Sequence, residues 1–120
     1  MDSENKWPKH FPNNCPPNGA KPYEGIVYRF CNNPLTDWDC QSHYERGSEK
    51  SCISCGLSVF TDLKETIEAH EAIPGMKKKI IGVWQLDNNA GVIKPRPKDS
   101  HCTWWKSNSV KVADYFVGEE

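Results

Sequence analysis

The apolar residues of this chain are concentrated in short segments that polar stretches separate. Leu, Ile, Val and Phe together make up 22 of the 120 residues, and they fall mainly in five segments and on one helix face. Segments of this length, rich in β-branched and aromatic residues and bounded by Gly, Pro, Asn or Asp, are typical of β-strands. The pattern therefore predicts an α+β fold, a compact single domain of five or six short strands, mainly antiparallel, with one or two helices.

The expected strands lie at 25–30, 56–60, 80–86, 92–94, 101–105 and 110–116. We expect 92–94 to pair back on the preceding strand across the turn at 87–91. The best helix is 62–72, where Asp62 can cap the N-terminus and Glu65 completes a capping box. Thr36 or Asp37 can cap a shorter helix that runs through Cys40.

A proline-rich arm at residues 1–24 precedes the single α+β domain at 25–120. Five of the nine prolines lie in this arm. Because proline fixes φ and removes a backbone donor, we expect extended or polyproline-like chain there. Trp7, Phe11 and Tyr23 are spaced along the arm and favour contact with the domain, although a disordered leader is the alternative.

Composition and the N-terminal residues bear on the class and location of the protein. The 15 basic residues nearly balance the 16 acidic ones, and five Trp add apolar surface, so a disordered tail, a collagen-like repeat and a coiled coil are excluded. No stretch is apolar enough to predict a transmembrane helix, and we expect no membrane partner. Met1–Trp7 has no apolar core of the kind found in secretory signals, which predicts a cytoplasmic protein.

Six cysteines are many for a cytoplasmic domain of this size. In a reducing compartment we expect them to be thiols or metal ligands and not disulfides. If the chain were exported, the six could form three bridges in any of fifteen connectivities.

Two ligand-like pairs, each with a two-residue gap, lie eight residues apart in the sequence. Such pairs can clamp one ion, and the four ligands would form a closed, structural Cys3His zinc site. Cys15 or Cys102 could replace the histidine. The alternative is that the cysteines are small buried hydrophobic residues and the histidine lies at the surface. The predicted zinc ligands are Cys40, His43, Cys52 and Cys55.

Three polar residues in the strand segments are candidates for a binding site. Arg29 lies in an apolar strand, where a guanidinium requires a partner and is suited to phosphate or carboxylate. Ser58 also lies in an apolar strand, where its hydroxyl must find a partner. His101 precedes two tryptophans, and histidine titrates near neutral pH.

These residues resemble a known family. Tyr28-Arg29 on a first strand, Ser58 on a following strand before a helix, and a polar residue on a late strand are similar to the compact ADP-ribosyltransferase-type fold. The resemblance implies that the chain binds NAD in a cleft between two small sheets and transfers ADP-ribose to a macromolecular target. It implies catalytic roles for Arg29, Ser58 and His101. The NAD-binding residues would be Tyr28, Arg29, Ser58, Phe60 and Trp104, with Tyr28 or Phe60 stacked on the nicotinamide.

The chain departs from the family at one point. Many members carry a glutamate on a late strand, whereas no glutamate lies between Glu71 and Glu119. Gln85 or His101 would have to replace it, or the chain would be an inactive, ligand-binding descendant. Structural roles are the alternative for the other candidates: Arg29 paired with Asp37 or Asp39, Ser58 bonded to backbone, and His101 as a cap or core residue.

A basic stretch supports a second hypothesis. Residues 77–111 hold eight basic residues, among them Arg96 and Lys98, against two acidic ones. Trp84, Trp104 and Trp105 are interleaved, a combination suited to single-stranded nucleic acid. Neighbouring strand residues face opposite sides, so at most one of the last two tryptophans should be core. The second hypothesis is a non-enzymatic, zinc-stapled interaction module that binds protein or nucleic acid through this basic, Trp-rich face. Solvated lysines on strand edges, or a purely structural domain, are the remaining alternatives.

Overall fold

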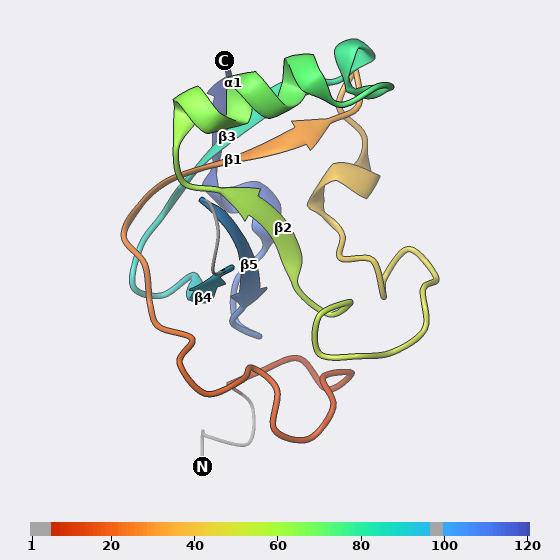
Figure 1. Cartoon of the computed structure of the whole chain (residues 1–120). Coiled ribbons are helices and arrows are strands. Elements are labelled where there is room, and N and C mark those ends of the chain that lie inside the picture. The colour runs from red at the N-terminus through yellow and green to blue at the C-terminus, as the bar shows by residue number, and fades with distance from the viewer. Residues whose placement is uncertain (1–5, 97–99) are drawn as a thin grey trace.

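The computed structural model describes residues 6–96 and 100–120 (Figure 1). Within these residues, six antiparallel strands form one sheet with the order β4-β5-β2-β1-β3-β6, and one α-helix accompanies them. This architecture confirms the predicted α+β class. The strands are β1 (Gly25–Cys31), β2 (Leu57–Phe60), β3 (Ile80–Leu86), β4 (Gly91–Pro95), β5 (His101–Lys106) and β6 (Phe116–Glu119).

The helices begin and end close to their predicted positions. Helix α1 (Leu63–Ala72) starts after Asp62, whose side chain accepts a hydrogen bond from the Glu65 amide at 3.0 Å. The Glu65 carboxylate does not close the predicted capping box and instead accepts from the Ser100 amide at 2.9 Å. The predicted short helix is the 3-10 helix η2 (Asp37–Cys40). Two further 3-10 turns are η3 (Met76–Lys78) and η4 (Val112–Tyr115).

The sheet consists of two three-stranded halves that are joined through β1 and β2. β1 and β3 are in register over all seven residues of β1, and β5 is in register with the whole of β2. Between β1 and β2, only Tyr28 and Phe60 are registered partners. From this pair the two strands diverge (Figure 1). On one side of the Tyr28–Phe60 pair, the half β4-β5-β2 is therefore separated from the half β1-β3-β6. We call this separation the split of the sheet.

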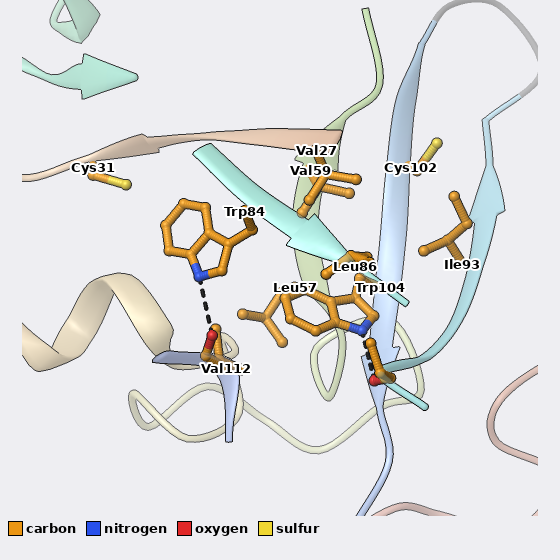
Figure 2. Packing of buried hydrophobic residues seen from close by; sticks show 11 residues of the cluster. Val27, Cys31, Leu57, Val59, Trp84, Leu86, Ile93, Cys102, Trp104 and Val112 are labelled. Atoms are coloured by element: carbon orange, nitrogen blue, oxygen red, sulfur yellow. Dashed lines mark hydrogen bonds between the residues drawn. The ribbon is translucent and has the colours of Figure 1, made fainter. Parts of the chain in front are cut away.

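One face of the sheet carries the hydrophobic core (Figure 2). Trp84 on β3 and Trp104 on β5 are both fully buried there. Their indole N–H groups donate to main-chain carbonyls, Trp84 to Val112 at 3.1 Å and Trp104 to Ala90 at 3.0 Å. Two large rings with satisfied N–H groups compensate for the small number of aliphatic residues. The rest of the cluster is Val27, Cys31, Leu57, Val59, Leu86, Ala90, Ile93, Cys102 and Val112.

The opposite face of β5 is covered by the arm and by the loop before β2. Trp105 is 1 % exposed, and its indole N–H donates to the Cys52 carbonyl at 2.8 Å. The prediction that only one of Trp104 and Trp105 is core is therefore wrong. The two side chains do lie on opposite faces, but both faces are covered at this point.

The N-terminal arm lies against the domain, as Trp7, Phe11 and Tyr23 suggested. Lys21 and Ile93 exchange main-chain hydrogen bonds of 2.9 and 2.8 Å, and the His10 ring stacks on Tyr44 with the centroids 5.0 Å apart. A disulfide joins Cys15 to Cys52, with 5.4 Å between the Cα atoms. The expectation that the cysteines form no disulfide is wrong for this pair, because the packed arm brings together two residues that are 37 positions apart.

Two strand predictions also need correction. Segment 92–94 does not pair back on the preceding strand, because β3 already lies between β1 and β6, and β4 pairs with β5 instead. Segment 110–116 is not a strand. Val112 is the first residue of η4, and the Val112 carbonyl accepts a hydrogen bond from the Trp84 indole. The chain becomes extended only from Phe116. None of the helices in the described part of the chain is long and apolar enough to cross a membrane.

Candidate functional site

A pocket of about 220 Å³ lies on the side where β1 and β2 diverge. β1 contributes Arg29 and Phe30, and β2 contributes Ser58 and Phe60. The loop between these strands supplies the outer wall through residues 41–43 and 46, and η3 contributes one methionine. Three residues of the predicted NAD site, Arg29, Ser58 and Phe60, therefore line one cavity, together with His43 of the predicted zinc set.

Arg29 is buried at the split between the two halves of the sheet. Its Nη1 donates to the Ser58 carbonyl at 2.8 Å, and its Nε donates to the Asp39 carbonyl at 3.2 Å. The guanidinium thus connects β1 with β2 where the ladder between them has stopped. Burial lowers the pKa of Arg29 to about 10, so the side chain remains a cation at neutral pH.

The charge of Arg29 is not neutralised by a hydrogen-bonded carboxylate in the described residues. The Asp39 carboxylate, also buried, accepts from the Thr36 amide at 2.8 Å and from the Asn32 amide at 2.9 Å. The sequence left open a pair of Arg29 with the carboxylate of Asp37 or Asp39. In the described residues, Arg29 is bonded instead to the main-chain oxygen of Asp39. A buried guanidinium bonded to neutral carbonyls retains donors and charge for an anionic ligand.

Ser58 and His101 are brought together on the face of the sheet opposite the core. The Ser58 hydroxyl is hydrogen-bonded to Nε2 of His101, which lies on the neighbouring strand β5. The His101 ring packs on Phe60 with the centroids 4.9 Å apart, and Phe60 packs on Phe30 at 5.4 Å. Ser58, Phe30 and Phe60 line the pocket, and the His101 imidazole lies outside the lining, in contact with Ser58 and Phe60.

The loop wall of the pocket contains a cation that sequence reasoning missed. Arg46 donates from Nε to the Trp38 carbonyl at 3.0 Å and also from Nη2 to the same oxygen. Its guanidinium lies 5.8 Å from the centroid of the Trp38 ring. Arg46 lies in a polar stretch beyond the short helix predicted through Cys40, so only the tryptophan eight positions earlier hinted at a stacked arginine.

Four predicted residues lie outside the lining of the pocket. His101 is one of them, and it is connected to the cavity through its hydrogen bond to the Ser58 hydroxyl. Tyr28 is the registered partner of Phe60 but does not line the cavity. Trp104 belongs to the core on the other face, and the prediction that it contacts the ligand is wrong for this cavity. Gln85, one of two residues considered in place of the family's glutamate, is exposed on β3 near Asp87 and Asp114.

The predicted zinc ligands do not form one cluster in the structure. Cys52 is bonded to Cys15, Cys55 is a buried thiol, Cys40 is half-buried and His43 is exposed at the pocket wall. The described ranges contain no group of three or more His, Cys, Asp or Glu residues that could hold a metal ion.

The basic, Trp-rich face is not formed as predicted. Trp84, Trp104 and Trp105 are all buried, so their rings cannot serve as stacking platforms for bases. Of the basic residues in that stretch, Lys98 lies outside the described residues. The exposed tryptophan is Trp38, on the pocket side of the molecule beside Arg46.

Comparison with known proteins gives no match: no family model, no curated protein and no solved structure matches the chain. The function of the site therefore has to be argued from the chemistry of the pocket. That chemistry comprises a buried cation, a serine hydroxyl that is bonded to an imidazole outside the lining, two aromatic rings and a second arginine.

Proposed function

We propose that the pocket binds NAD and that the protein transfers ADP-ribose to a macromolecular target. The observation that carries the proposal is the position of Arg29, a cation buried at the split of the sheet in a cavity that Ser58 and Phe60 also line. A dinucleotide supplies what each group lacks: phosphate charge for the guanidinium, ribose hydroxyls for the serine, and a flat ring for the phenylalanines.

The size of the pocket determines which part of NAD it holds. A volume of about 220 Å³ is below the ~300–1,000 Å³ of pockets for drug-sized ligands, so it suits one half of a dinucleotide. We place the nicotinamide and its ribose against Phe60 and Ser58, with the adjoining phosphate toward Arg29. The adenosine half would extend over the surface outside the cavity.

The proposed reaction breaks the bond between ribose C1′ and the nicotinamide nitrogen, and the bonding electrons leave with neutral nicotinamide. A nucleophilic atom of the target forms the new bond to C1′ and gives up a proton. We assign the acceptance of that proton to the Ser58–His101 pair: the Ser58 hydroxyl, which lines the cavity, takes the proton and passes its own to Nε2 of His101. Arg29 and Ser58 act by holding the phosphate and ribose in place and by stabilising charge.

The test combines NAD titration calorimetry with a nicotinamide-release assay. We expect Ser58→Ala and His101→Ala to lower affinity or release rate at least about tenfold, the effect of losing ~1.4 kcal/mol. Gln85→Ala is the matched control, because this exposed residue on β3 lies outside the pocket and should behave as wild type. Absence of NAD binding and a release rate equal to buffer in all four proteins would overturn the proposal.

A zinc-stapled module that binds protein or nucleic acid stays a competing prediction. Zinc binds thiolates, so the predicted set requires reduction of the Cys15–Cys52 bond. Elemental analysis of reduced, zinc-loaded protein against Cys55→Ser tests it, and one metal per chain in wild type only would support it. The cytoplasmic location is likewise a prediction, and the disulfide argues for an oxidising compartment instead.

A further inference from the structure

Arg46 is held at the wall of the pocket by contacts that fix its guanidinium. Two of its nitrogens, Nε and Nη2, donate to the Trp38 carbonyl, and the plane lies near the Trp38 ring. The segment that carries it is closed by main-chain bonds, among them the Arg46 amide to the Ser42 carbonyl at 3.1 Å. An arginine that is oriented before binding loses less entropy when it meets a ligand.

The charges around the cavity favour an anion. Arg29, Arg46 and His43 line it, and no aspartate or glutamate is among the described lining residues. The nearest acids in the sequence are engaged elsewhere. Glu45 accepts from the Ser42 amide and hydroxyl at 2.9 and 3.1 Å, and the Asp39 carboxylate is bonded as described above. Positive side chains around a partly enclosed cavity concentrate the field that attracts an anion.

The two arginines differ in how much of their bonding capacity the fold uses. Arg29 is buried and joins β1 to β2 through two main-chain carbonyls, so it acts partly as structure. Arg46 is only half-buried, and its side-chain hydrogen bonds to the described residues converge on one oxygen. Its outer edge can therefore donate to two oxygens of a ligand without disturbing the sheet.

We propose that Arg46 is a second diphosphate-binding residue of this pocket, which acts together with Arg29 and has His43 beside it at the wall. For NAD as the ligand this inference rests on the proposed function, but the diphosphate chemistry itself can be tested without NAD. Trp38 acts as a positioning residue, because it holds the guanidinium through its carbonyl and its ring.

The probes are inorganic pyrophosphate, NAD and nicotinamide riboside, which carries no phosphate, each titrated into the full-length protein. Arg46→Gln should weaken pyrophosphate and NAD at least tenfold and leave nicotinamide riboside unchanged. Arg46→Lys, which keeps the charge but not the fork, should lie between wild type and Arg46→Gln. Lys50→Gln is the matched control, since Lys50 lies on the same loop outside the cavity and should not change any affinity. Thermal melting verifies that each variant folds.

The outcomes separate this inference from the proposed function. NAD and pyrophosphate affinities equal to wild type in folded Arg46→Gln would overturn the assignment of Arg46 and leave NAD binding standing. Pyrophosphate binding that requires Arg46, without any NAD binding, would support the diphosphate site and overturn the proposed function. Wild-type protein that binds neither probe would overturn both.

Discussion

The Cys15–Cys52 disulfide should contribute a large part of the stability of this protein. It joins the arm to the loop before β2 across 37 positions, and constraint of an unfolded loop of that length is worth about 4 kcal/mol. Unfolding entropy scales with chain length, and for 120 residues about 4 kcal/mol corresponds to a Tm change of about 15 °C. The bridge also holds the chain whose carbonyl accepts from Trp105, so its loss exposes that ring.

The assay is thermal melting of wild type and of Cys15→Ser/Cys52→Ser, each with and without dithiothreitol. We expect the reductant to lower the Tm of wild type to that of the double variant, and to leave the double variant unchanged. The double variant is thus its own control for other effects of the reductant. A wild-type shift below about 3 °C, or an equal shift in the double variant, would refute the reasoning.

Three further predictions follow from the fold. Gly91→Ala should lower the free energy of unfolding in urea far more than Gly47→Ala does. Both glycines have positive φ, but a Cβ at Gly91 would lie 2.1 Å from a main-chain oxygen, whereas a Cβ at Gly47 would meet nothing within 4 Å. Equal losses of unfolding free energy would contradict this packing. Burial raises the pKa of Cys31 to about 11. Peptide mapping should therefore show that iodoacetamide alkylates half-buried Cys40 first, and Cys31 only as the pH approaches that value. Comparable labelling of the two thiols at pH 8 would be inconsistent with the burial of Cys31. Trp84→Phe leaves a buried carbonyl without its donor and should cost ~1–3 kcal/mol by chemical denaturation, and an unchanged midpoint would argue against the bond.

The fold was predictable where the local pattern and the tertiary environment agree. Segment 80–86 is apolar except for Gln85 and includes three β-branched residues, and β3 has those bounds because it is the central strand of its half. Segment 110–116 alternates like a strand, yet Val112 closes the core above Trp84 and starts a 3-10 turn. That difference depends on a contact 28 positions away, which no local pattern contains.

The candidate site was partly predictable for the same reason. Arg29 and Ser58 are conspicuous as polar residues in apolar strands, and the structure places both at one cavity. Arg46 carries no such signal, because it lies in a polar stretch whose path is set by the Trp38 carbonyl and by the closure of the loop. The pairing of Cys15 with Cys52 required knowledge of where the arm packs.

The most direct test of the account is a ¹H–¹⁵N NMR titration of the protein with NAD. If NAD binds in this pocket, it should shift the side-chain Nε–H signals of Arg29 and Arg46 and the backbone amides of Ser58 and Phe60, which lie around the split of the sheet. The indole signal of Trp84, whose N–H is bonded to the Val112 carbonyl in the core and which does not line the pocket, should stay in place. An unchanged spectrum, or shifts confined to residues away from this pocket, would contradict the assignment of the site.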